Sequence, residues 1–201
     1  EAMDGPTVVW LREQAMALNA VVTGSVQIRD DAAVFNRMLW AAPDGSIRHY
    51  DKRHLFRMAG EHKRYLAGKQ RVVVPFQGWR ILLQVCYDLR FPVFSRNRED
   101  FDLMLYVANW PATRRTHWRQ LLIARAIENQ ACVVGVNRIG SDARGLDYSG
   151  DSLAIGGDGI MLGDMENENG AARVVLSGAA LQSYREGFPC QLDADGFQLV
   201  D

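Results

Sequence analysis

Apolar positions recur along the chain with two periods, one typical of helices and one typical of strands. Helical spacing predicts an amphipathic first helix that is capped by Asp4 and has Pro6 just inside, with an apolar face of Val8, Leu11, Ala15 and Leu18. A second helix is predicted over residues 116–130, with one stripe of Trp118, Leu121, Leu122 and Ala126 and another of Ile123 and Ile127. Two stripes favour contact with a sheet on one side and with a partner subunit on the other. A last helix is predicted over residues 179–188.

Strand-like runs fill the rest of the chain, at residues 21–28, 35–42, 47–51, 71–76, 80–88, 102–109, 131–138 and 151–157. The turn sequences PDGS and QGW predict hairpins between the second and third runs and between the fourth and fifth. Residues 102–109 are continuously apolar, as in a strand covered on both faces. Hairpins mixed with strand-helix-strand passages predict an α+β domain, a mixed sheet with helices on its outer face.

Length and charge narrow the class of protein. The chain has 201 residues and 48% hydrophobic composition, enough for one sizeable core, so residues 1–201 are interpreted as a single domain. Lys and Arg total 23 against 24 Asp and Glu. This balance provides no field that would attract nucleic acid or a membrane surface. No apolar segment approaches the length of a membrane span, and the start lacks a signal-peptide layout, so a soluble protein is expected.

Cysteine and histidine usage indicates neither disulfides nor a metal site. The three cysteines, Cys86, Cys132 and Cys190, are an odd number, far apart and without a CxxC pair. Free thiols in a reducing cytoplasm fit this pattern. The four histidines form no set with the spacing of metal ligands.

Cys86 is the first candidate for chemistry, because an apolar strand ends on it and charged residues follow at once. A cysteine in such a strand is usually an inert core thiol. Here the following DLRFP provides backbone N–H groups at a predicted helix start, and another strand ends in Asp51-Lys52-Arg53. A thiolate near a helix N-terminus or a lysine has a lowered pKa and becomes a usable nucleophile.

Lys52 and Glu61 each have an ordinary interpretation beside the functional one. Most lysines are solvated, and Glu61 in GEHKRY could be one surface carboxylate in a run of charges. The functional interpretation is a lysine at an active sheet edge with a carboxylate that orients its ammonium.

Several separated motifs, in the same order, resemble the nitrilase superfamily of carbon-nitrogen hydrolases. They are DKRHLF, EHKRYLAG, LLQVCYDLRFP, LYVANWP and HWRQLLIARAIENQ. The resemblance runs from the first helix almost to the C-terminus and is strongest for the omega-amidase (YafV-like) branch. It implies a four-layer α-β-β-α sandwich, a homodimer, a small-molecule amide substrate and a Glu-Lys-Cys triad that needs no cofactor. Cys86 matches the nucleophile, Lys52 the triad lysine and Glu61 the second glutamate that supports it.

The first glutamate of the triad, the general base, has no match in this sequence. In the family it lies in an L-P-E motif ahead of the helix with which this chain begins, and Glu1 precedes a capping segment instead. Two explanations compete: residues missing at the N-terminus, or a shortened homologue without activity. We favour missing residues, because deleting an edge of the sandwich would leave strand edges unpaired.

Amide hydrolysis would use Cys86 as nucleophile and Lys52 with the Tyr87 backbone N–H as oxyanion donors. An omega-amidase cleaves the terminal amide of small 2-oxo dicarboxylic acid monoamides, so the pocket must hold a carboxylate at its far end. Arg90 is the candidate to bind that carboxylate, with a structural ion pair to Asp88 as its alternative.

Three further residues are candidates to shape the pocket. They are Phe91, Trp110, which could instead cap the core, and Arg138, which could lie at the surface.

Two alternatives to the omega-amidase function stay open. One is another reaction of the superfamily, on an N-carbamoyl compound or a nitrile; the nitrile is less favoured, because Tyr87-Asp88 stands where true nitrilases carry Trp-Glu. The other is a homologue that binds partners without catalysis, which the unmatched glutamate would explain.

Overall fold

The computed structural model describes residues 1–199, and its helices lie close to the predicted ranges. The α-helices are α1 (Pro6–Leu18), α2 (Arg115–Asn129) and α3 (Gly178–Gly187). The strands are β1 (Val22–Asp30), β2 (Ala33–Ala41), β3 (Ile47–Asp51), β4 (Val73–Phe76), β5 (Trp79–Val85), β6 (Leu103–Ala108), β7 (Cys132–Asn137), β8 (Ile139–Ser141), β9 (Asp147–Ser149), β10 (Leu153–Ile155) and β11 (Met161–Asp164).

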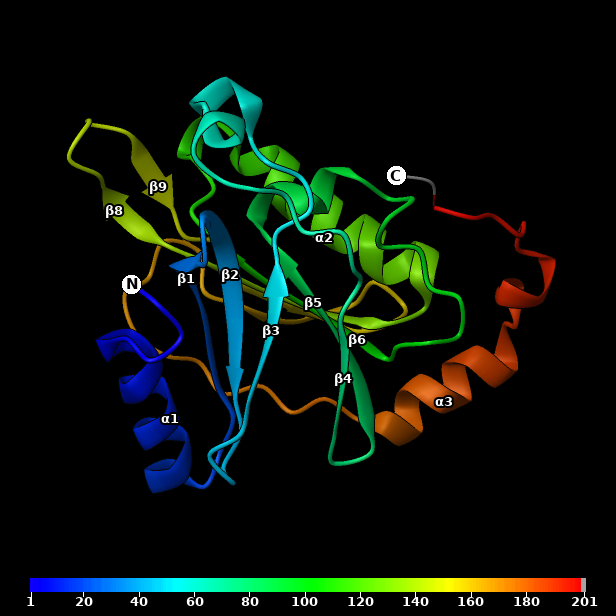
Figure 1. Cartoon of the computed structure of the whole chain (residues 1–201). Helices are drawn as coiled ribbons and strands as arrows, with labels where there is room; N and C mark the ends of the chain where they lie inside the picture. Colours follow the sequence, from blue (N-terminus) through cyan, green and yellow to red (C-terminus); the bar gives the residue numbers. More distant parts are fainter. Residues whose placement is uncertain (200–201) are drawn as a thin grey trace.

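The strands form two main sheets (Figure 1). The first has the order β1-β2-β3 and is antiparallel throughout. The second has the order β11-β10-β7-β6-β5-β4, in which β5, β6 and β7 run parallel and the outer pairs are antiparallel. The predicted mixed sheet is therefore confirmed. The small hairpin of β8 and β9 was not predicted, because three-residue strands leave too little alternation to detect.

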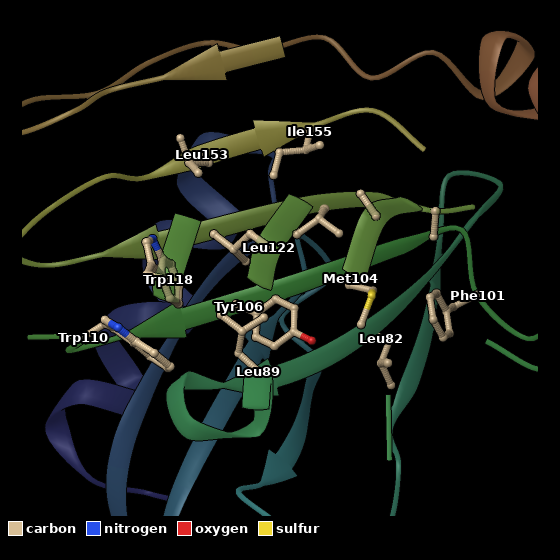
Figure 2. Packing of buried hydrophobic residues seen from close by; sticks show 13 residues of the cluster. Leu82, Leu89, Phe101, Met104, Tyr106, Trp110, Trp118, Leu122, Leu153 and Ile155 are labelled. Carbon is tan, nitrogen blue, oxygen red and sulfur yellow. The ribbon is translucent and has the colours of Figure 1, made fainter. Parts of the chain in front are cut away.

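Three apolar clusters separate four layers. α1 packs on the three-stranded sheet through Val8, Leu11, Ala15, Ile28, Leu39 and Ala41. The two sheets pack face to face through a cluster that includes Met38, Tyr50, Ile81 and Leu83. The outer face of the six-stranded sheet is covered by α2 (Figure 2), through a cluster that includes Met104, Tyr106, Trp118 and Leu122. Each strand between two layers turns alternate side chains to different clusters, which gives the α-β-β-α order that was expected.

Two details of the α1 prediction are wrong. The N-cap is Gly5, without a side-chain cap, and the carboxylate of Glu1 accepts hydrogen bonds from Thr7 N, Thr7 Oγ1 and Val8 N. Asp4 therefore does not cap the helix. Leu18 is 64% exposed, because the helix ends there and Asn19 adopts a left-handed conformation.

α2 has the predicted sheet-facing stripe. Trp118, Leu122 and Ala126 are buried in the outer cluster, and Trp118 also donates from Nε1 to the Asp151 carbonyl oxygen at 2.7 Å. Ile127, in the second stripe, is 49% exposed. The partner subunit inferred for that side stays a prediction.

Candidate active site

The parallel strands β5, β6 and β7 bring three loops to one edge of the six-stranded sheet. Cys86 follows β5, Asn109 and Trp110 follow β6, and Asn137 ends β7. Carboxyl ends of adjacent parallel strands meet at the same edge, where ligands usually bind. The Asn137 amide fixes the middle loop: Oδ1 accepts from Trp110 N at 2.7 Å, and Nδ2 donates to the Trp110 carbonyl at 3.2 Å.

Cys86 is held in an unusual backbone conformation. β5 ends at Val85, and Cys86 begins a short 3-10 helix, Cys86–Arg90, with a φ of 49°. A left-handed residue other than glycine is strained, and such residues cluster at functional sites. The Cys86 Sγ lies 4.0 Å from the carbonyl oxygen of Asn109, which directly follows β6.

A buried carboxylate holds this turn against the end of β3. Asp88 is fully buried and accepts hydrogen bonds from Val85 N (2.9 Å) and the Tyr50 hydroxyl (2.9 Å). It also accepts from His54 N (2.9 Å) and contacts His54 Nδ1 at 2.8 Å. Tyr50 and His54 flank Lys52, so Asp88 fixes the lysine-bearing segment relative to the cysteine turn. This positioning role of Asp88 was not predicted from the sequence, where Asp88 was considered as an ion-pair partner for Arg90 and as half of the Tyr87-Asp88 pair.

Lys52 and Glu61 form the pair that the resemblance implies. The Lys52 side chain is 2% exposed, and its Nζ donates to Glu61 Oε2 at 2.7 Å. The same Oε2 accepts from Phe56 N at 2.7 Å. A buried ammonium requires such a partner to keep its charge, so the interpretation of Lys52 as a solvated lysine is excluded.

The expected lowering of the Cys86 pKa is wrong in direction. Burial, the largest cause, raises the pKa of the Cys86 thiol; the charge of Lys52 lowers it, and the charge of Glu61 raises it again. Glu61 offsets the positive charge of Lys52 within their ion pair. The lowering of the Cys86 pKa by Lys52 therefore does not outweigh the raising of that pKa by burial. The resting sulfur therefore carries its proton at neutral pH, and attack requires a base.

Cys86, Lys52 and Glu61 line one cavity of about 230 Å³ together with Tyr87, Arg90 and Trp110. Six of the eight predicted site residues thus come together.

The other two predicted residues do not line the cavity. The Phe91 ring is stacked on that of His54, with centroids 3.9 Å apart, and is edge-on to the Tyr87 ring at 5.1 Å. Arg138 is exposed and does not line the cavity; its guanidinium lies over Tyr148, 4.6 Å from the ring centroid. Arg138 therefore contacts a residue that lines the cavity without lining it itself.

Arg90 is not paired with Asp88, which was its alternative interpretation. Its Nη2 lies 2.8 Å from His117 Nδ1, and its guanidinium carbon lies 5.0 Å from the Trp110 ring centroid. Trp110 is 3% exposed, so it shapes the cavity while its Nε1 donates to the Arg114 carbonyl at 2.8 Å.

Several residues that line the cavity were not predicted from the sequence, namely Asn36, Phe56, Arg114, Leu146 and Tyr148. Asn36 lies within β2 and Tyr148 within β9, and the other three lie outside the α-helices and strands; no local pattern marks any of the five as lining a cavity. Arg114 lies in PATRR, where nothing local distinguishes it from Arg115. Within residues 1–199 no group of three or more His, Cys, Asp or Glu side chains is arranged to hold a metal ion. None of the helices in that range is long and apolar enough to span a bilayer.

Comparison with known proteins identifies relatives across nearly the whole chain. The family model for carbon-nitrogen hydrolase matches residues 1–186. The omega-amidase YafV of Yersinia enterocolitica is 54% identical over 192 residues, which cover 95% of this chain and 75% of that protein. The 2-oxoglutaramate amidase of Bacillus subtilis (strain 168) is 34% identical over 184 residues, covering 90% of this chain and 71% of that protein.

A solved structure shares the fold closely. The crystal structure of XC1258 from Xanthomonas campestris, a CN-hydrolase superfamily protein with an arsenic adduct in the active site, matches with a TM-score of 0.95 at 53% identity. It covers 100% of this chain, and this chain covers 78% of it.

Proposed function

The chain belongs to the carbon-nitrogen hydrolase family, and we propose that it hydrolyses the terminal amide of small 2-oxo dicarboxylic acid monoamides, such as 2-oxoglutaramate, with release of ammonia. The observation that carries the proposal is the buried Lys52–Glu61 pair, which lines the same cavity as a strained, half-buried Cys86. The relatives named as omega-amidase and 2-oxoglutaramate amidase support the substrate class.

In the proposed reaction, Cys86 Sγ attacks the amide carbonyl carbon and its proton passes to a base. Lys52 Nζ and the Tyr87 N–H stabilise the oxyanion that forms. Tyr87 lies in the first turn of the 3-10 helix, where backbone N–H groups have no partner within the helix. The C–N bond then breaks, the nitrogen takes up the proton and ammonia leaves. Water attacks the thioester, which releases the acid and restores the thiol.

The reaction also needs a base that accepts the Cys86 proton. Glu61 is the one carboxylate among the described residues that line the cavity, and its Oε2 is engaged by Lys52 and Phe56. The family resemblance assigns the base to a different glutamate, which no residue of this sequence matches. Activity is therefore best measured on the polypeptide translated from the full reading frame.

Arg90 is the proposed site for the substrate carboxylate. Its guanidinium lines the cavity, and no carboxylate of residues 1–199 pairs with it. A guanidinium binds a carboxylate with two parallel hydrogen bonds, which orients the ligand as well as holding it. The amide at the other end of the substrate would then face Cys86.

The test is ammonia release from 2-oxoglutaramate, compared with an N-carbamoyl amino acid and a small nitrile as substrates. The proposal predicts the highest kcat/KM for 2-oxoglutaramate and its loss in Cys86→Ala. Faster turnover of the carbamoyl compound or of the nitrile would reassign the substrate, and equal release by Cys86→Ala would remove the thiol mechanism.

A homodimer in the cytoplasm completes the proposal. Ile127 of α2 and the nearby Ile160 are 49% and 61% exposed, which favours a partner on that side of the molecule. All three cysteines are free, as is usual for proteins in a reducing compartment. Light scattering of the purified protein tests the dimer, and an Ile160→Glu variant should shift it toward monomer.

A further inference from the structure

Two arginines line the Cys86 cavity without an acidic partner. Arg90 contacts His117 and Trp110, and the guanidinium carbon of Arg114 lies 5.5 Å from the Phe56 ring centroid. Among residues 1–199, no carboxylate forms a salt bridge with either arginine. The described lining of the cavity thus has three cationic side chains, those of Lys52, Arg90 and Arg114, against the carboxylate of Glu61 alone. Such a lining favours an anionic, acceptor-rich ligand.

Both guanidinium groups are placed by contacts that leave donors free. His117 Nδ1 takes one N–H of Arg90, and aromatic rings cover one face of each arginine. The loop that carries Arg114 is fixed by the bond from Trp110 Nε1 to its carbonyl oxygen. Each guanidinium has five N–H donors and no acceptor. A single carboxylate on Arg90 therefore leaves Arg114 without a partner.

We propose that Arg114 determines specificity by donating hydrogen bonds to the 2-oxo group of the substrate while Arg90 holds the adjacent carboxylate. This inference rests on the proposed function and extends it. The 2-oxo acid head places a ketone oxygen beside a carboxylate and presents acceptors only, which matches a pair of donor-only side chains. A 2-amino acid places an ammonium in the same position. Its positive charge and its N–H donors face two guanidinium groups, so the cavity rejects it.

The kinetic test compares two amides that differ only in this group, 2-oxoglutaramate and glutaramate, on the full-length protein. The measured quantity is the ratio of their kcat/KM values. Losing a hydrogen bond from a charged donor corresponds to about 10- to 150-fold, so Arg114→Gln should lower the ratio by at least about tenfold. Arg114→Lys should lower it less, since an ammonium still donates. Arg12→Gln, an exposed arginine on α1, is the matched control and should leave the ratio unchanged.

An equal loss of kcat/KM for both amides in Arg114→Gln would overturn the inference. Arg114 would then bind the substrate carboxylate or stabilise its own loop instead of contacting the 2-oxo group. Unchanged kcat/KM values for both amides would also overturn it. L-Glutamine gives the complementary result: Arg114→Gln should raise its kcat/KM relative to that of 2-oxoglutaramate.

Binding to the Cys86→Ala protein separates this inference from the proposed function. Calorimetry gives the Kd of 2-oxoglutarate and of glutarate, with and without Arg114→Gln. The preference for the 2-oxo ligand should fall by at least about tenfold. If the unsubstituted protein hydrolyses neither amide but this preference falls, the proposed function fails and the assignment of Arg114 stands. If both amides are hydrolysed and the preference is unaffected by Arg114→Gln, the assignment of Arg114 fails alone.

Discussion

Replacement of Asp88 by alanine tests how the turn that begins at Cys86 is held against the segment that carries Lys52. The carboxylate is fully buried and accepts from Val85 N and the Tyr50 hydroxyl, two donors that have no access to water. A buried donor without a partner costs about 1–3 kcal/mol, so Asp88→Ala should lower the free energy of unfolding by about 2–6 kcal/mol. The His54 side chain is 21% exposed. We therefore expect the His54 groups that contact Asp88 to form hydrogen bonds with water in the variant.

The stability assay is denaturant unfolding followed by tryptophan fluorescence. Asp4→Ala is the matched control: Asp4 is exposed and does not cap α1, so its loss should change the free energy of unfolding by less than about 0.5 kcal/mol. A cost below about 1 kcal/mol for Asp88→Ala would refute the hydrogen-bond assignment.

Asp88→Asn separates positioning from stability. The amide keeps the volume of the carboxylate, but its NH₂ group meets a donor, so the turn and the Lys52 segment should shift relative to each other. Small displacements of reacting groups cost up to about 100-fold in rate. We therefore expect kcat for ammonia release to fall at least about tenfold, with a smaller change in KM. A loss of stability with kcat unchanged would leave Asp88 a purely structural residue.

Three further predictions follow from single contacts. Burial raises the pKa of Cys86 and Lys52 lowers it, so Lys52→Met should move the inflection of the alkylation rate of Cys86 to higher pH; a shift to lower pH would contradict this assignment. Gly135→Ala should cost about 1–3 kcal/mol in unfolding free energy, because its Cβ would lie 2.6 Å from Leu122 Cδ1; an unchanged midpoint would mean that α2 packs less closely. Burial raises the pKa of Asp102, but hydrogen bonds from two arginines outweigh it and hold the pKa at about 2. The stability that Asp102 provides is then present above its unfolded pKa of about 4 and lost as pH falls toward 2, and Asp102→Asn should flatten the fall in stability across that range.

The order of the three α-helices and of strands β1 to β7 and β10 could be predicted from the sequence, because apolar period and turn chemistry are local. Gln77 and Gly78 adopt positive φ values of 47° and 82°, which suits the two-residue turn between β4 and β5. The predicted turn included Trp79, which in fact pairs with Phe76 as the first residue of β5. The boundaries of a strand depend on its hydrogen-bond pairing with neighbouring strands, which the sequence of that strand alone does not reveal.

The candidate site was predictable only in part, for the same reason. Cys86 and Lys52 each directly follow a strand, a local feature, and the structure brings both to one cavity. Arg114 shares its cavity with Arg90 only because β6 and α2 are joined by a loop over the sheet edge. The direction of the Cys86 pKa shift could not be predicted either, since it depends on burial and on the neutralisation of Lys52 by Glu61.

The thioester mechanism at Cys86 is tested most directly by the intact mass of the full-length protein, quenched with acid within milliseconds of mixing with 2-oxoglutaramate. We expect a transient species heavier by the mass of the substrate minus ammonia, with the addition mapping to Cys86 and absent in Cys86→Ala. Ammonia release with no such species in the unsubstituted protein, and at the same rate in Cys86→Ala, would contradict it.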